Sequence, residues 1–159
     1  MVIKPVKEMI KWVAETSNII LDPDLDSHYL SSAAIVILPN TLNSLSEFLL
    51  YSESVIFKGF RSRDDMIKFA VFAGNLEESS ERIQQNITNA LREDKLFYGI
   101  SESLQKNIPP ALNNYQASVV PFLVVLKRIA NDPGSSIGIE EFLESAMALI
   151  NSGAQLRET

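Results

Sequence analysis

The chain has 159 residues, of which 46% are hydrophobic and 21% are charged, and its formal net charge at pH 7 is −6. This length and composition fit one globular domain with its own core, which excludes extensive disorder. The acidic balance argues against a general nucleic-acid-binding protein, because such proteins need a positive field. Cysteine is absent, so disulfides, thiol catalysis and Cys-ligated metal sites are excluded.

The sequence lacks the pattern of a secretory signal or of a membrane span. Pro5 and charges every few positions interrupt the first fifteen residues, so no apolar signal core forms. The longest nearly apolar run, Ala117–Leu126, is well short of the about 20 residues that a span needs. We therefore expect a cytoplasmic protein without membrane contact.

A first helix is predicted over Pro5–Ile20, because proline suits the first helical position. Its apolar stripe recurs at helical spacing and consists of Val6, Met9, Val13 and Ile20. Ile10 and Trp12 flank this stripe. Three lysines form a basic edge, Lys4, Lys7 and Lys11, which we interpret as a solvated face.

The next segment has two interpretations. A helix over His28–Leu38 follows an acidic loop and ends before a proline, and Thr41 is predicted to cap a further helix, Leu42–Tyr51. The apolar stretches Ala33–Leu38 and Ser54–Phe60 also have the composition of short strands. We predict an all-α bundle, and the alternative is an α+β fold in which these stretches pair as strands.

Capping and breaking residues divide the middle of the chain. Ser62 is a good N-cap for a helix that Gly74 ends. Leu76–Leu96 follows as a polar helix with a narrow apolar stripe, as expected when one side packs and the rest is solvated. Ser101 opens a short helix, Glu102–Asn107, which two prolines stop.

Ala111–Ala130 is apolar nearly all round, which is typical of a buried helix. We predict that it is the central helix, with about seven helices in total packed as one bundle. Pro121 is expected to kink it. Tyr115 and Phe122 lie near the kink and are the candidates for lining a pocket, if the protein carries a small apolar ligand.

The last helix is predicted over Ile139–Asn151, after a turn rich in Pro, Gly and Ser. Gly153 is expected to end it. The domain would then span residues 1–153, followed by a frayed tail over 154–159.

Residues for catalysis, metal binding or nucleotide binding are few. His28 is the single histidine, too few for a His-based metal site, and the scattered glycines form no phosphate loop. Asp22 begins an EF-hand-like run, but Ser27 and Ala33 occupy the positions that need Gly and Glu. We therefore predict no catalytic, cofactor-binding or metal-ligating residue.

The high apolar content and low charge predict a surplus of apolar surface, and large exposed patches mark interaction sites. The expected contributors are Ile10 and Trp12 on the first helix and Met147 and Leu149 on the last. The favoured function is a non-catalytic regulatory or adaptor module that contacts a protein partner and forms a homo-oligomer. The alternatives are the ligand carrier described above and, with least support, a carboxylate-dependent enzyme.

Overall fold

In the computed structural model, the residues described are 9, 25–58, 62–95, 100–132, 134 and 137–159. Within these ranges the chain forms helices and no strand. They are α2 (Leu25–Ser31), the π-helical turn η2 (Ser32–Ile37), α3 (Leu38–Phe57), α4 (Arg63–Glu93), α5 (Glu102–Asn131) and α6 (Ile139–Glu158). Because α2, η2 and α3 follow one another without a break, this part of the chain has four long helices.

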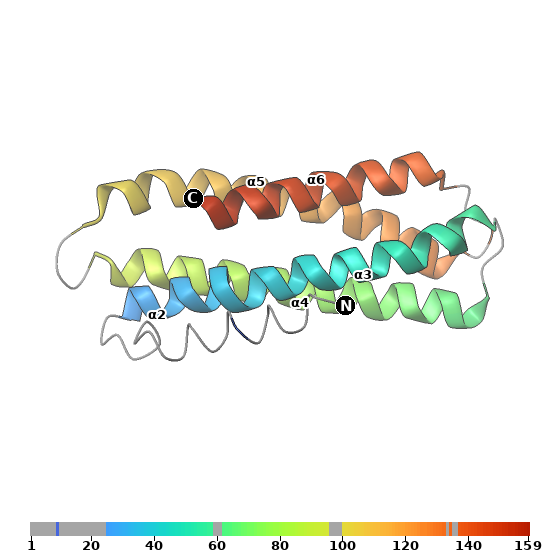
Figure 1. Cartoon of the computed structure of the whole chain (residues 1–159), viewed down its shortest axis with the longest axis horizontal. Helices are drawn as coiled ribbons and strands as arrows, with labels where there is room; N and C mark the ends of the chain where they lie inside the picture. Colours follow the sequence, from blue (N-terminus) through green and yellow to red (C-terminus); the bar gives the residue numbers. More distant parts are fainter. Residues whose placement is uncertain (1–8, 10–24, 59–61, 96–99, 133, 135–136) are drawn as a thin grey trace.

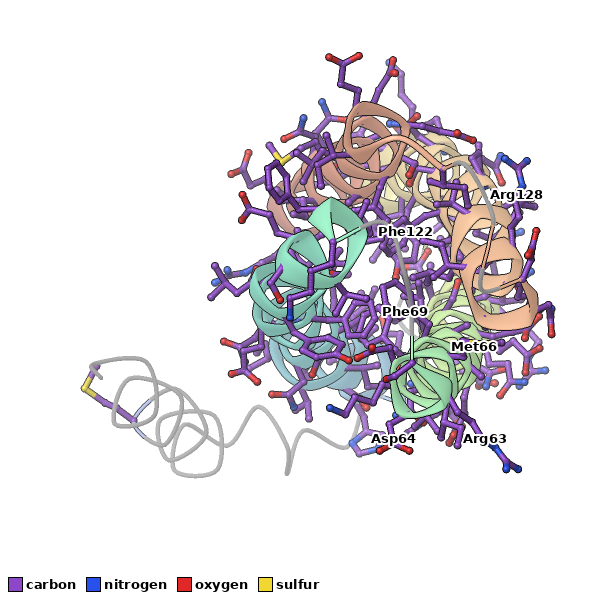
Figure 2. All side chains as sticks on the ribbon, turned by 90° about the vertical axis from the view of Figure 1, so that its right-hand side faces the viewer. Arg63, Asp64, Met66, Phe69, Phe122 and Arg128 are labelled. Carbon is purple, nitrogen blue, oxygen red and sulfur yellow. The ribbon has the colours of Figure 1, made fainter. Side chains whose placement is uncertain are left out.

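The four helices form an antiparallel bundle (Figure 1). Seen end-on, α3, α4, α5 and α6 occupy the four corners, and each helix packs against two neighbours (Figure 2). Phe69 of α4 and Phe122 of α5 point into the space between the helices (Figure 2). The all-α class is therefore confirmed, and the α+β alternative is wrong for the described residues, because Ala33–Leu38 and residues 54–57 are helical.

The prediction of about seven helices is wrong, because most of the expected breaks lie inside continuous helices. Gly74 lies within α4 and Gly153 within α6, and α6 continues to Glu158. Leu156 is buried in that last turn, so residues 154–158 pack instead of fraying. The two prolines at 109 and 110 lie inside α5. Buried residues lie on both sides of Gly74 and Gly153, and α5 is buried from Leu112 onward, directly after its two prolines. This packing outweighs costs of about 1 kcal/mol for Gly and about 3 kcal/mol for Pro.

The π-helical turn accommodates Pro39. A proline ring crowds the carbonyl four residues earlier, here that of Ile35. That carbonyl lies within η2, and the Leu38 N–H donates to the Ala33 carbonyl five residues back. The wider turn lets one helix run through the proline. Thr41 is consequently not an N-cap: it lies inside α3 and donates its hydroxyl hydrogen to the Ile37 carbonyl at 2.9 Å.

The expected central helix is also wrong. Ala111–Ala130 belongs to α5, which is one of four equivalent corners and not a helix enclosed by the others (Figure 2). Val120 is 61% exposed and Val124 is 52% exposed, so the outer face of α5 meets solvent. Because this exposed face carries valines, the segment Ala111–Ala130 is apolar on nearly all sides, as a buried helix would be.

The core is tied together by phenylalanines from all four helices. Phe48 of α3 lies 4.9 Å from Phe69 of α4, between ring centroids, in an edge-to-face arrangement. Phe142 of α6 lies 6.3 Å from Phe69 and 5.5 Å from Phe122 of α5. These are the distances at which aromatic pairs attract beyond simple burial, by about 0.5–1.5 kcal/mol for each pair.

Two predicted N-caps are confirmed. The Ser62 Oγ accepts a hydrogen bond from the Asp65 N–H at 3.1 Å, and the Asp65 carboxylate accepts one from the Ser62 N–H at 3.0 Å. This reciprocal capping box satisfies two free donors at the start of α4. The Ser101 Oγ caps α5 by accepting a hydrogen bond from the Leu104 N–H at 3.4 Å. The predicted helix Pro5–Ile20, apart from Met9, and the Asp22 loop lie outside the described residues.

Candidate interaction surfaces

The contact between α3 and α6 fixes which of their residues lie side by side. A Cβ added to Gly153 would lie 2.8 Å from Leu42 Cδ2, so the backbone of α6 passes close to α3 at this point. The two helices run antiparallel (Figure 1). Both rise about 1.5 Å per residue, so Leu50 is level with the turn of α6 between Leu143 and Met147.

Around this height along the bundle axis, both helices carry exposed apolar side chains. Phe57 is 87% exposed, Leu50 77%, Met147 50% and Leu143 38%. Leu50 lies about 80° around α3 from Leu42, and Leu143 lies at a similar angle from the contact point on α6, so both turn outward beside the seam. We call these four residues the α3–α6 patch. Leu50 and Phe57 are its most exposed members, and they lie two turns apart on one face.

Glutamates surround the α3–α6 patch. Glu53 lies between Leu50 and Phe57 along the same face of α3, and Glu140 and Glu144 flank Leu143 on α6. All three glutamates are exposed, and none belongs to an ion pair found among the described residues. The surface is therefore an apolar strip whose rim carries these three glutamates and, beside Phe57, the exposed Lys58.

The exposed apolar residues described on α4 and α5 do not form a comparable patch. Ile67 and Val71 lie on α4, and Val120 and Val124 lie on α5. The Lys127–Glu77 ion pair, at 3.0 Å, sets the register between these helices. In this register Val71 of α4 and Val124 of α5 lie about 14 Å apart along the bundle axis. The α4 pair and the α5 pair serve as controls for the α3–α6 patch, because their side chains are similarly exposed but the two pairs lie apart from each other.

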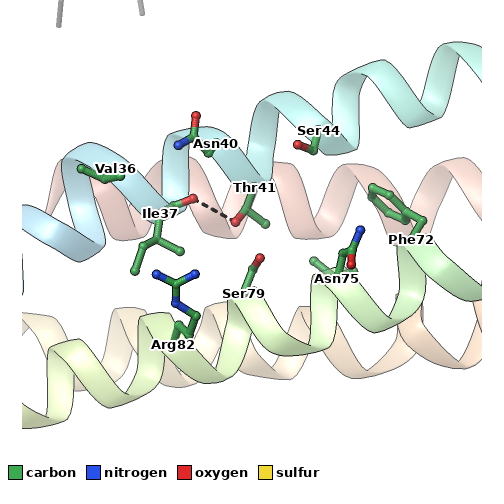
Figure 3. Close-up of a pocket in the computed structure, with 10 residues that line it drawn as sticks. Val36, Ile37, Asn40, Thr41, Ser44, Phe72, Asn75, Ser79 and Arg82 are labelled. Carbon is green, nitrogen blue, oxygen red and sulfur yellow. Dashed lines mark hydrogen bonds between the residues drawn. The ribbon is translucent and has the colours of Figure 1, made fainter. Parts of the chain in front are cut away.

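A groove of about 220 Å³ lies between α3 and α4 and is half open to solvent. Figure 3 shows Arg82, Ser79 and Asn75 of α4 facing Ile37 and Thr41 across it. The groove is smaller than the usual pocket for a drug-sized ligand, about 300–1,000 Å³. Its walls mix one guanidinium with amides, hydroxyls and apolar side chains, and no carboxylate lines it. No group of three potential metal ligands is found in the described ranges.

Tyr51 and Asp65 connect α3 to the start of α4. The Tyr51 hydroxyl donates a hydrogen bond to the Asp65 carboxylate. Burial, together with this bond and the negative charge of Asp65, raises the pKa of Tyr51 to about 12. Hydrogen bonds from Ser62 and Tyr51 lower the pKa of Asp65 to about 2. The Lys68 ammonium lies 4.6 Å from the Tyr51 ring centroid. Since Tyr51 stays protonated and Asp65 ionised at neutral pH, the group holds two helices together and has no proton to exchange.

Tyr115 and Phe122, the predicted pocket residues, are fully buried in the core. Burial raises the pKa of Tyr115 to about 12, while an interaction with Ser80 opposes the change. Among the residues that the structure describes, the Tyr115 hydroxyl finds no hydrogen-bond partner of good geometry. Neither residue lines the groove between α3 and α4. The structure therefore places both residues in the packing of the bundle and gives no support to the carrier hypothesis.

The predicted partner-binding residues have different locations. Ile10 and Trp12 lie outside the described residues. Met147 belongs to the α3–α6 patch, whereas Leu149 is fully buried and offers no surface to a partner. Neither Leu50 nor Phe57 was predicted from the sequence. Leu50 comes directly after a residue on the face of α3 that packs in the bundle. Phe57 follows seven residues later, and this spacing was a signal that α3 has a second apolar face, which points outward.

One described helix, Asp26–Phe57, is long and apolar enough to cross a membrane by length and composition. Its most apolar window has a mean hydropathy of 1.3, and 28% of that window is buried in the bundle. A mostly buried core helix of a soluble protein meets the same criterion, and so does a signal sequence near the N-terminus. The helix also carries polar side chains that face α4, including Thr41 and Ser44 in the groove, so its apolar composition alone does not place it in a bilayer.

Comparison with models of protein families, with curated proteins and with solved structures found no match.

Proposed function

We propose that this protein is a non-catalytic adaptor or regulatory module of the cytoplasm that acts through protein contacts at the α3–α6 patch and self-associates. The observation that carries the proposal is the exposure of Leu50 and Phe57 beside Leu143 and Met147. Burying a leucine or phenylalanine side chain stabilises a complex by about 1.5–3 kcal/mol, so leaving two exposed on one face favours a bound state.

The arrangement of the patch also supports a protein partner over a small ligand. Its four residues follow the seam between two long helices and do not enclose a cavity. A stable interface buries about 800 Å² on each partner, with an apolar centre and a polar rim. The α3–α6 patch has that organisation, because the glutamates on α3 and α6 surround its apolar centre.

Sedimentation equilibrium of the pure protein tests this proposal. We expect the wild type to associate in the micromolar range, and Leu50→Ser with Phe57→Ser to weaken the association at least about 30-fold, as for two anchor residues at an interface. The control is Ile67→Ser with Val71→Ser, which removes two apolar side chains of α4 that are 51% and 56% exposed and should leave the association unchanged. A wild type that stays monomeric at high micromolar concentration, with no partner captured from cells, would refute the proposal.

A further inference from the structure

We propose that the groove between α3 and α4 binds a small monocarboxylate, whose carboxylate pairs with Arg82 and whose apolar chain packs on the floor of the groove. The inference does not depend on the proposed function, because the α3–α6 patch lies on a different seam of the bundle. Three observations support it: the short side chains that keep the groove open, the single charge in its lining, and its apolar floor.

Short polar side chains keep the groove open where α3 and α4 meet. They are Asn40 and Ser44 on α3, and Asn75 and Ser79 on α4. The two residues of each pair are four positions apart, so they lie on one face of their helix. Larger side chains at these positions would close the seam, whereas a space of about 220 Å³ remains. This is the volume of about seven water molecules at about 30 Å³ each, which is enough for a small organic molecule.

Arg82 is the one charged residue in the lining of the groove. Glu78 lies four residues before it, a spacing at which ion pairs form on helices, but no ion pair joins the two among the described residues. The guanidinium instead extends across the groove toward Ile37 (Figure 3). A guanidinium can only donate hydrogen bonds, and a carboxylate matches its geometry with two parallel bonds. A carboxylate is therefore the group that this end of the groove suits.

Further hydrogen-bond donors lie beside Arg82. The Ser79 hydroxyl points across the groove toward Thr41 (Figure 3). Thr41 already donates its hydrogen to the Ile37 carbonyl, at 2.9 Å, and this is the one hydrogen bond that joins residues of the lining. Neither Ser79 nor Asn75 donates a side-chain hydrogen bond to another residue in the described ranges, so both donors are available to a bound anion.

The floor of the groove is apolar and held in place by the core. Ile37 and Leu76 are buried members of that core. Phe72 lies at the opposite end of the groove from Arg82 (Figure 3), and its ring stacks on that of Phe48 with 3.9 Å between centroids. A ligand that pairs with Arg82 therefore extends its apolar chain along the floor toward Phe72. Each methylene group that becomes buried there tightens binding up to about fourfold.

Titration of the full ¹⁵N-labelled chain, followed by NMR, tests this inference. The probe is hexanoate, and hexanamide is its neutral counterpart of the same size. We expect hexanoate to bind with a dissociation constant on the order of 1 mM, as for a ligand of so few atoms, and to shift the amide signals of the groove residues most. Hexanamide should bind at least about fivefold more weakly, because it has no charge to pair with Arg82. Butanoate should bind about five- to fifteenfold more weakly, because it is shorter by two methylene groups.

Three variants locate the site. Arg82→Gln should weaken hexanoate binding at least about fivefold and change hexanamide binding less than about twofold. Ser79→Met fills the groove without changing its charge and should abolish the binding of both molecules. The control is Arg63→Gln, which removes an exposed arginine of α4 outside the groove and should change neither affinity more than about twofold. Circular dichroism verifies folding, and Arg82→Gln, at an exposed position, is sufficient by itself if Ser79→Met does not fold.

Ligand binding also stabilises the bundle, because the bound molecule bridges α3 and α4. At ten times the dissociation constant, hexanoate should raise the urea midpoint of the wild type by about 0.7 M, and the same concentration of chloride should not. Three results would overturn the inference: a hexanoate dissociation constant above about 100 mM, as for a solvated ion pair, equal affinities for hexanoate and hexanamide, or equal losses with Arg82→Gln and Arg63→Gln.

Discussion

The close approach of α6 to α3 allows a quantitative prediction with two glycine-to-alanine substitutions. Gly74 and Gly153 both lie in helix interiors. A Cβ at Gly74 would meet no atom within 4 Å, whereas one at Gly153 would lie 2.8 Å from Leu42 Cδ2. Alanine is favoured over glycine in a helix by about 1 kcal/mol, so Gly74→Ala should stabilise the protein by about that amount.

At Gly153 the same gain meets a steric cost. Leu42 must move by several tenths of an ångström to restore an ordinary contact distance. A displaced side chain costs about 0.5–1.5 kcal/mol, and inserting a methyl group into a packed seam costs about 1–3 kcal/mol. We therefore expect Gly153→Ala to leave the free energy of unfolding unchanged or to lower it. Its free energy of unfolding should be at least about 1 kcal/mol smaller than that of Gly74→Ala.

Urea unfolding followed by circular dichroism at 222 nm measures this difference. With a slope of about 2 kcal/mol per molar urea, a gap of 1 kcal/mol moves the midpoint by about 0.5 M. In a Leu42→Ala background the obstructing atoms are gone, so Gly153→Ala should give the same gain as Gly74→Ala. Equal gains at both glycines in the otherwise wild-type protein would refute the proposed close approach of the two helices.

Three further predictions concern buried and titrating groups. Tyr115→Phe removes a buried hydroxyl without a well-placed partner and should raise the free energy of unfolding by about 1 kcal/mol, measured by urea titration. Phe122→Ala removes a fully buried ring and should lower that energy by about 3–5 kcal/mol, observed as a large fall in the midpoint. The pKa of Asp65 lies at about 2 in the fold, below its ordinary 3.8, so its stabilising contribution is complete above pH 3.8 and is lost as the pH falls toward 2. Because Asp65 is largely solvated, we expect a loss of only about 1 kcal/mol between pH 5 and 2, and Asp65→Asn should abolish that part of the pH dependence.

Local signals in the sequence determined the fold class and several boundaries. Apolar residues at helical spacing predicted helices over most of the chain, and no strand occurs in the described ranges. Ser62 and Ser101 were correct as N-caps because a serine side chain satisfies a free N–H through contacts within one turn. Such interactions need no information from distant parts of the chain.

The number and arrangement of helices depended on tertiary packing. Gly74, Gly153 and the prolines at 109 and 110 are intrinsic helix breakers, but burial along α4, α5 and α6 outweighs their local cost. The sequence could not show that Ala111–Ala130 has a solvated outer face, because valine occurs on buried and exposed faces alike.

The α3–α6 patch was likewise decided by the tertiary structure. The sequence identified a surplus of apolar residues and selected Met147, which is a member of the patch. It also selected Leu149, which is buried, because two residues along a helix turn a side chain by about 200°, from an outward to an inward position. Leu50 and Phe57 become part of one surface with α6 only through the antiparallel register set at Gly153 and Leu42, a contact between residues more than one hundred positions apart. Composition predicts that apolar surface is left over, and only packing decides where it lies.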